Sequence, residues 1–135
     1  MGETPGVTLV RSVWDAVNRA GIEAAIPFLD SRARWRAVED GPWNCEGRQA
    51  ILAFFAKRDN QAPAGRLESA VDVEGRIVVG FRPALPPDDG WPLEEGIRYV
   101  VVTVADGRIT ELKGCPSREV ALAYARDPVP PPAPA

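Results

Sequence analysis

The chain has 135 residues, with 16 Lys and Arg against 19 Asp and Glu, two Cys and no His. Domains cluster at roughly 100 to 150 residues, so a chain of this length forms one domain with its own core. Imidazole is the commonest metal ligand and the usual base near neutral pH, so the lack of His excludes His-based triads and zinc sites. The net charge of −3, with acids interleaved among the bases, argues against nucleic-acid binding. We expect no metal, no cofactor and no nucleic-acid partner.

The two cysteines, Cys45 and Cys115, are far apart and lack the CxxC spacing of zinc and redox sites. We therefore expect two reduced, partly buried thiols. The first residues lack the regions of a signal peptide, and no run approaches the ~20 apolar residues of a membrane span. These features predict a soluble, cytoplasmic protein that has no membrane partner.

Two helices are predicted near the N-terminus. Apolar residues recur every three or four positions over residues 7–20, which is typical of an amphipathic helix. The Thr-Pro pair at 4–5 suits the start of this helix, and Gly21 suits a left-handed stop. A second helix over 22–29 should be short or bent, because Pro27 has no amide hydrogen to donate.

The pattern then changes from period 3.6 to period two. Apolar and cationic residues alternate over 33–38, which predicts a strand with one apolar and one cationic face. Residues 39–42 carry a turn signal, Glu-Asp-Gly-Pro. A third helix is predicted over 48–58, with an apolar side formed by Ile51, Leu52, Phe54 and Phe55.

Two hairpins follow. Strands are predicted at 66–73 and 76–82 around a Glu-Gly turn, and at 97–104 and 108–114 around an Asp-Gly turn. The Pro-rich loop between the hairpins, residues 83–96, is too long for a simple turn.

The C-terminal part holds one more helix and a tail. Ser117 can cap a helix over 118–126 that turns Val120, Ala123 and Tyr124 inward. Residues 127–135 are rich in Pro and are predicted to be disordered. Antiparallel hairpins without helical crossovers predict an α+β fold with helices on one face of a curved sheet.

Three short motifs resemble those of one protein family. They are Asn18–Ala25 at the junction of the first two helices, Cys45–Ile51 at the start of the third helix, and Asp106–Glu111 in the last hairpin. Together with the element order, they resemble the nuclear transport factor 2-like superfamily, and more narrowly the SnoaL-like proteins of actinobacteria. The resemblance covers about residues 7–124.

The resemblance implies a single SnoaL-like domain over residues 1–126. Its fold would be a cone, in which a curved antiparallel sheet wraps around the three helices of the N-terminal half, with a short C-terminal helix outside. It also implies an apolar pocket open at one end, a small apolar ligand and a homodimer.

Fold does not give function, so the enzymes of the superfamily are compared position by position. A ketosteroid-isomerase-like enzyme needs a carboxylate at the rim and two oxyanion donors. The corresponding places hold Ala37 or Val38, Val13 or Trp14, and Tyr99 or Val100. A limonene-epoxide-hydrolase-like enzyme needs a pair of acids, where this chain has residues 76–78 and Gly114. The SnoaL-type cyclases and dehydratases generally use a His, which this chain lacks.

The candidate ligand-binding residues are aromatic: Trp14, Trp35, Trp43, Phe54, Phe55, Phe81 and Tyr99. They either fill the core or line an apolar pocket in which indole and phenol groups orient a ligand. The primary hypothesis is therefore a small-molecule-binding domain without a recognisable catalytic set.

The alternative hypothesis is an isomerase, hydrolase or cyclase. It would use Asp40 as the base and Tyr99 or Trp14 as the hydrogen-bond donor, with Asp40 pressed against Trp43 so that burial raises its pKa. The simpler interpretation is that Asp40 lies in a solvent-exposed turn and has no catalytic role. Arg34 and Arg36 are expected on a solvated face of the sheet.

Carboxylates on the first predicted hairpin are candidate partners for these two arginines. Arg34 and Arg36 are expected to face a partner chain or to pair with Glu68 and Asp72 across the sheet.

Overall fold

The computed structural model describes residues 3–39, 41–42, 44–59, 65–83 and 93–128. Asp40, Trp43 and most of the Pro-rich tail therefore lie outside the described residues. The elements, in chain order, are α1 (Pro5–Ala20), the 3-10 helix η1 (Ile22–Phe28), β1 (Leu29–Arg36), β2 (Cys45–Glu46), α2 (Arg48–Asp59), β3 (Arg66–Val73), β4 (Arg76–Arg82), β5 (Arg98–Ala105), β6 (Arg108–Cys115) and α3 (Arg118–Arg126).

Helix α1 has the ends that its sequence predicts. The Thr4 hydroxyl accepts a hydrogen bond from the backbone N–H of Val7 at 3.3 Å, which satisfies an amide that no helical carbonyl can reach. Gly21 ends the helix with φ +90°, where a side chain would be strained. The helix buries one stripe, made of Val7, Val10, Val13, Trp14 and Val17.

The segment after α1 differs from the prediction in detail. The short second helix forms, but as a 3-10 helix with Pro27 inside it. Strand β1 then begins at Leu29, earlier than the predicted start at Ala33. The pairing of β1 with β6 shifts register between Leu29 and Arg34. Because of this irregularity, an alternation of apolar and polar residues does not reveal the first half of the strand.

The six strands form one sheet in the order β2-β1-β6-β5-β4-β3. Both predicted hairpins are confirmed, and each turns on two residues with positive φ, Glu74-Gly75 and Asp106-Gly107, as type I′ turns require. The sheet is mixed rather than wholly antiparallel, because β1 lies parallel to β6. No hairpin links these two strands, so no local turn fixes their relative direction.

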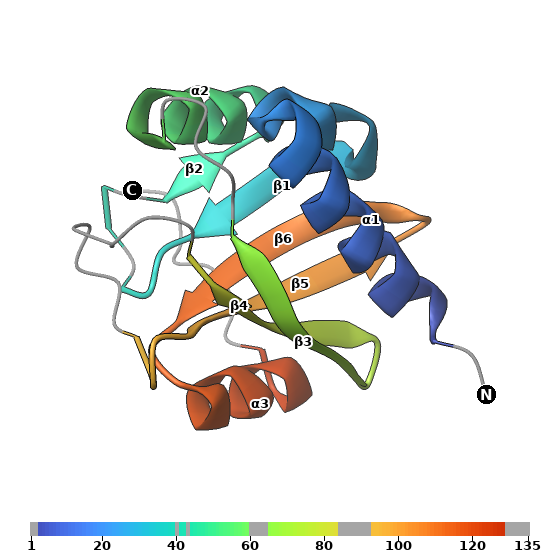
Figure 1. Cartoon of the computed structure of the whole chain (residues 1–135), viewed down its shortest axis with the longest axis vertical. Coiled ribbons are helices and arrows are strands. Elements are labelled where there is room, and N and C mark those ends of the chain that lie inside the picture. The colour runs from blue at the N-terminus through green and yellow to red at the C-terminus, as the bar shows by residue number, and fades with distance from the viewer. Residues whose placement is uncertain (1–2, 40, 43, 60–64, 84–92, 129–135) are drawn as a thin grey trace.

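The sheet is covered on both sides, with α1 and α2 on one side and α3 on the other (Figure 1). We call these sides the α1 face and the α3 face. Along β5, Val100 and Val102 pack into the core cluster beneath α1, whereas Tyr99 and Val101 pack beneath α3. This division follows the alternation of side chains along a strand. The expected α+β fold, a curved sheet around N-terminal helices with one C-terminal helix outside, is confirmed.

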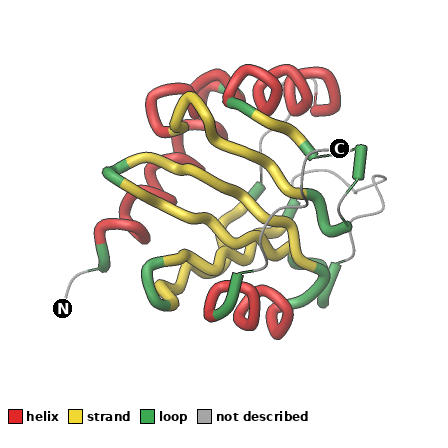
Figure 2. The backbone as a smooth tube through the Cα atoms, turned by 180° about the vertical axis from the view of Figure 1, so that it is seen from behind, coloured by secondary structure: helices red, strands yellow, loops and turns green. Residues whose placement is uncertain are grey.

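The sheet is curved, as the backbone trace shows (Figure 2), and its register is interrupted at two further places. Shifts occur between Leu67 and Ser69 in β3 and between Thr103 and Val104 in β5. An extra residue on one strand increases local twist and bending. From the strand directions, β1, β4 and β6 finish at the same end of the sheet at which β3 and β5 start. We call this the loop end.

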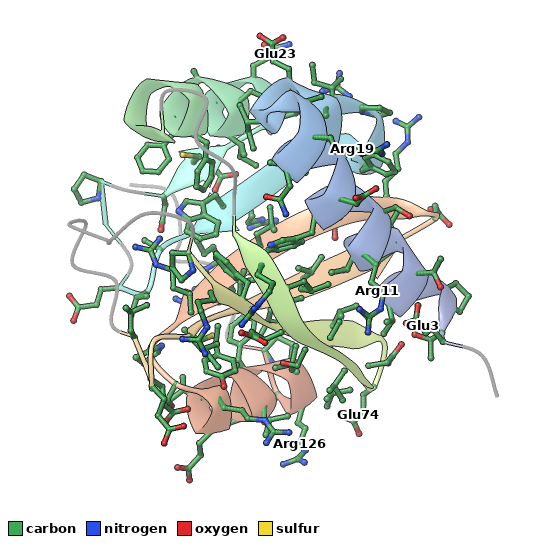
Figure 3. All side chains as sticks on the ribbon, viewed as in Figure 1. Glu3, Arg11, Arg19, Glu23, Glu74 and Arg126 are labelled. Carbon is green, nitrogen blue, oxygen red and sulfur yellow. The ribbon has the colours of Figure 1, made fainter. Side chains whose placement is uncertain are left out.

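Many charged side chains lie on the surface of the domain, and the six labelled in Figure 3 point away from the core. Arg11 and Glu3 form an exposed ion pair at 2.5 Å, and Arg19 pairs with Asp15 one helical turn earlier at 3.0 Å. Among the described residues, no helix is both long and apolar enough to cross a bilayer.

Candidate functional site

Five of the predicted aromatic residues gather on the α1 face: Trp14, Trp35, Phe54, Phe55 and Phe81. The Trp14 and Phe81 ring centroids are 5.4 Å apart, and those of Trp35 and Phe55 are 5.2 Å apart with the rings edge to face. Both distances are typical of favourable aromatic pairs. Trp14, Trp35 and Phe81 are buried, whereas Phe54 and Phe55 on α2 remain partly exposed.

Trp14 carries a polar group that the surrounding structure does not satisfy. Its side chain is only 8% exposed, and its indole Nε1 is buried without a hydrogen-bond partner among the described residues. A buried N–H that lacks an acceptor costs about 1–3 kcal/mol. Buried polar groups are therefore almost always paired, and an exception in the interior needs an explanation.

Tyr99 lies apart from these aromatic residues. It packs on the α3 face with Val78, Val101 and Cys115. Its ring lies across Gly80 of the neighbouring strand, where an added Cβ would come within 3.0 Å of Tyr99 Cε1. The Tyr99 hydroxyl and the Trp14 indole therefore serve opposite faces of the sheet. Asp40 and Trp43, the other predicted site residues, lie outside the described residues.

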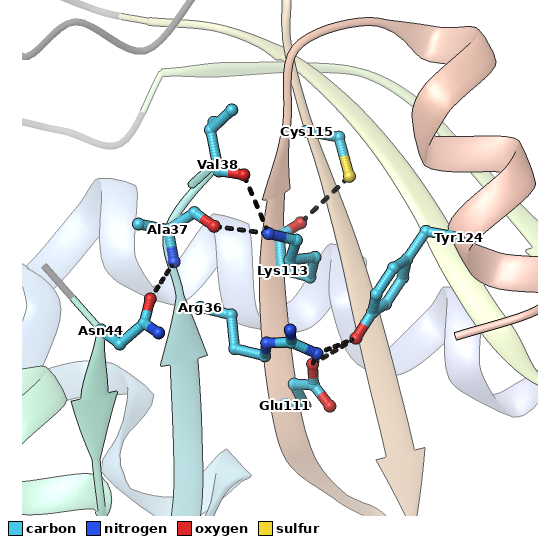
Figure 4. Close-up of polar contacts among 8 residues, drawn as sticks. All are labelled: Arg36, Ala37, Val38, Asn44, Glu111, Lys113, Cys115 and Tyr124. Carbon is cyan, nitrogen blue, oxygen red and sulfur yellow. Dashed lines mark hydrogen bonds and ion pairs between the residues drawn. The ribbon is translucent and has the colours of Figure 1, made fainter. Parts of the chain in front are cut away.

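The α3 face holds a buried polar cluster made of Arg36, Glu111 and Tyr124, which we call the α3 cluster (Figure 4). The Tyr124 hydroxyl donates to Glu111 Oε1 at 2.5 Å and accepts from Arg36 Nη1 at 3.0 Å. Arg36 Nη1 also lies 3.6 Å from Glu111 Oε1. The Arg36 side chain is 3% exposed and that of Glu111 17%, so this ion pair is largely shielded from water.

This cluster corrects the predicted partners of the β1 arginines. Arg36 was expected on a solvated face with Glu68 or Asp72 as a partner, but β3 lies at the far edge of the sheet from β1. Glu68 instead pairs with Arg66 and Arg82. The inward-facing tyrosine of the last helix was the sequence signal for the cluster, but its partners follow from the β1–β6 pairing, which the sequence did not reveal.

A second group of contacts fixes the chain after β1. The Lys113 ammonium donates to the carbonyl oxygens of Ala37 at 2.6 Å and Val38 at 3.1 Å (Figure 4). On the other side, the Asn44 side-chain oxygen accepts from the Ala37 N–H at 2.8 Å. These bonds hold both backbone groups of Ala37, at the start of the segment that contains Asp40.

Two groups on the α3 face, Tyr124 and Cys115, have raised pKa values, which favour their neutral forms. Burial, and then the hydrogen bond to Glu111, raise the pKa of Tyr124 to about 12. Burial raises the pKa of the Cys115 thiol to about 11, although Lys113 opposes this shift. Cys45, whose pKa is also raised by burial, lies on the α1 face, so no disulfide joins the two thiols. Neither cysteine is a ready nucleophile at neutral pH.

Within the described part of the chain, no group of three or more Cys, Asp or Glu side chains is placed to hold a metal ion. The α3 cluster joins α3 to β1 and β6 through the Tyr124 hydroxyl, which bonds to both Arg36 and Glu111, so we interpret it as a structural clamp between the helix and the strands. The α1 face, by contrast, is mainly apolar, and it contains the Trp14 indole N–H, which has no acceptor among the described residues.

Comparisons with known proteins identify relatives by fold only. No protein-family model matches the chain, and no curated protein sequence matches it. A SnoaL-like protein of unknown function from Burkholderia thailandensis is similar in structure, with a TM-score of 0.64, 11% identity, and coverage of 84% of this chain and 96% of that one. TerC, co-crystallized with polyporic acid, gives a TM-score of 0.61 at 14% identity and covers 87% of this chain and 98% of its own.

A de novo designed protein with a curved β-sheet has the same architecture, with a TM-score of 0.64 at 15% identity over 88% of this chain and 90% of the design. A fold that can be built by design carries no function by itself. The function must therefore be argued from the side chains of this chain.

Proposed function

We propose that this chain, which has the SnoaL-like fold of the nuclear transport factor 2-like superfamily, binds a small, mainly apolar molecule on the α1 face at the loop end. The observation that carries the proposal is the buried Trp14 Nε1, which has no acceptor among the described residues. A ligand oxygen would supply that acceptor. Ligand sites generally combine an apolar, aromatic lining with a few polar groups that set orientation.

The lining and the fold support this proposal. Phe54 and Phe55 are partly exposed beside buried Trp35, so aromatic surface continues from the core toward the outside. One row across the sheet on this face, Ala70, Val79, Val100 and Gly114, has a small residue at each end. TerC, which shares the fold, was co-crystallized with polyporic acid, an organic molecule.

The proposal is for binding rather than catalysis. The isomerase-like alternative pairs Asp40 with the Tyr99 hydroxyl; Asp40 lies outside the described residues, and Tyr99 packs on the α3 face, so this alternative would use a different face from the one proposed here. Trp14 remains as a donor on the α1 face, and an indole N–H orients a ligand without exchanging a proton. We also propose a homodimer, which the family resemblance supports, and light scattering that gives only the monomer mass at high concentration would contradict it.

Adjacent positions on β3 give a matched test of the binding face. Ala70 packs on the α1 face, whereas Val71 is 42% exposed and lies on the opposite face. Ala70→Phe should fill the space beside the aromatic cluster and abolish binding of a neutral naphthalene-based fluorescent dye. Val71→Phe adds a larger side chain to the same strand and should leave dye binding unchanged.

Dye binding is followed by fluorescence titration, and folding of both variants by circular dichroism. Equal dye binding by wild type and Ala70→Phe would place the site elsewhere and contradict the proposal, as would a wild type that binds no dye at all.

A further inference from the structure

The sheet has two edges of very different length. One edge is β2, which has two residues, and the other is β3, which has eight. Natural proteins commonly keep edge strands short or cover them, because their free backbone groups can pair with another chain. The shift of register between Leu67 and Ser69 interrupts the first part of β3. Residues 69–73 remain as a regular, continuous edge.

The pairing with β4 shows which backbone groups of this edge are free. Val73 and Arg76 flank the two-residue turn and pair with each other, so their backbone groups bond across the hairpin. Bonded and non-bonded pairs alternate along an antiparallel ladder. Val71 therefore also bonds to β4, whereas the N–H and C=O groups of Ala70 and Asp72 point outward. Within the described part of the chain, these four outward groups have no hydrogen-bond partner.

An exposed apolar side chain lies between these free groups. Val71 projects on the α3 face, because its neighbour across the ladder, Val78, packs into the cluster beneath α3. Of the large hydrophobic side chains that are exposed among the described residues, Val71 alone lies in a strand. The apolar row formed by Val101, Val78 and Val71 therefore ends at the edge with an uncovered valine.

We propose that a second copy of this chain pairs with the β3 edge, antiparallel and about a two-fold axis, so that Val71 faces the partner's Val71. In this register, Ala70 of each copy exchanges two backbone hydrogen bonds with Asp72 of the other, which satisfies all the free groups. The two valines form a non-hydrogen-bonded pair, in which the Cβ atoms are roughly 5 Å apart. This inference rests on the homodimer of the proposed function and gives it an interface.

The symmetry of the edge favours a second copy over an unrelated strand. Free groups lie at equal distances on both sides of Val71, so the pattern complements itself about a two-fold axis, as the interface of a symmetric dimer requires. On the α3 face, the helix already covers the middle strands, so a second copy cannot stack on the centre of the sheet (Figure 1). The β3 edge has no such cover on its outer side.

The charges beside the edge are balanced. The Asn18 side chain bonds to Gly65, directly before β3, so the flank of α1 that carries Asn18 lies on the β3 side. Asp15 and Arg11, about one and two helical turns earlier, lie on the same flank. Each belongs to an exposed ion pair of α1, so this flank has no net charge and two copies of it can meet without repulsion.

Two exposed valines give a matched test of the interface. Val71→Lys places like charges opposite each other at the two-fold axis and should weaken the dimer by about fivefold or more. Val120→Lys makes the same change on α3, where the residue is 45% exposed against 42% for Val71, and should leave the dimer unchanged. Association is measured by analytical ultracentrifugation up to about 1 mM protein, and folding by circular dichroism.

Ala70→Pro tests the backbone pairing. Proline removes an outward N–H that β3 does not use in its ladder with β4, and proline is tolerated at such positions of edge strands. The two-fold axis doubles the change, so two of the four intermolecular hydrogen bonds are lost and the dimer should weaken by about tenfold.

Amide hydrogen exchange reports the register. The N–H groups of Ala70 and Asp72 should become protected as the protein concentration rises, whereas those of Val71 and Val73 should be protected at every concentration. A wild type that stays monomeric throughout would overturn this inference and the homodimer, while dye binding tests the ligand site separately. A dimer that Val71→Lys leaves intact, or that Val120→Lys dissociates instead, would overturn this inference alone. If Ala70→Pro does not fold, Val71→Lys and the wild-type exchange decide the question.

Discussion

The α3 cluster makes a strong prediction about stability. Glu111→Gln keeps the shape of the side chain and removes its charge, so the buried Arg36 guanidinium loses the attraction of this carboxylate. At the observed separation of 3.6 Å and an effective dielectric constant near 20, the lost attraction is ~5 kcal/mol. Removal of one partner of a buried pair generally costs about 3–5 kcal/mol. We expect the free energy of unfolding to fall by that amount, which is a large share of the total for a small domain.

Tyr124→Phe should cost less, about 2 kcal/mol. It removes the hydroxyl and both of its charge-assisted hydrogen bonds, but it leaves the ion pair in place. Urea denaturation measures both variants, with Glu23→Gln, an exposed carboxylate, as the control that should stay within about 0.5 kcal/mol of wild type. A Glu111→Gln protein within about 1 kcal/mol of wild type would refute the reasoning that this pair is shielded from water.

The same cluster predicts how stability depends on pH. The pKa of Tyr124 is raised to about 12 in the folded protein, above the value near 10 of an unperturbed Tyr. A raised pKa means that folding favours the protonated phenol, so this stabilisation is fully present below about pH 10 and is lost as pH rises through about 12. The difference in unfolding free energy between wild type and Tyr124→Phe should therefore stay constant below pH 10 and shrink above it. A difference that grew with pH would contradict the assignment.

Three further predictions concern single contacts. Asn18→Ala should destabilise the protein by about 1–3 kcal/mol in urea denaturation, because the side chain donates to the Gly65 carbonyl at 2.8 Å and accepts from its N–H at 3.1 Å. Lys113→Met should cost a similar amount by the same measurement, since it removes the bonds to two carbonyl oxygens after β1. Cys115 should react with iodoacetamide at least about a hundredfold more slowly at pH 8 than in urea-unfolded protein, because its pKa is about 11 instead of 9.0; equal rates would contradict its burial.

The elements that the sequence predicts well are those specified by neighbouring residues. The cap and stop of α1 depend on Thr4 and Gly21, which lie next to the helix. The two hairpins depend on turns whose residues tolerate positive φ. Strand β2 was missed because it has only two residues, too few for any alternation to show.

Features that depend on distant pairing were not predictable. The parallel contact between β1 and β6 decides that Arg36 meets Glu111, and nothing local to either residue specifies it. The faces of β5 illustrate a second limit. Its run from Tyr99 to Val102 is apolar at every position, because α1 covers one face and α3 the other. Such a run shows that both faces are buried, but not which face a given residue occupies.

The assignment of Tyr99 and Trp14 to opposite faces also separates stability from binding. The α3 cluster and the proposed ligand site share the strands but no side chain, because alternate residues of β5 and β6 serve one face or the other. Substitutions on faces without shared partners generally act independently. Tyr124→Phe should therefore lower the free energy of unfolding while leaving the affinity for the naphthalene-based dye within about twofold of wild type at temperatures well below unfolding. A large loss of affinity in this variant, measured by the same fluorescence titration, would show that the clamp on the α3 face also shapes the binding face.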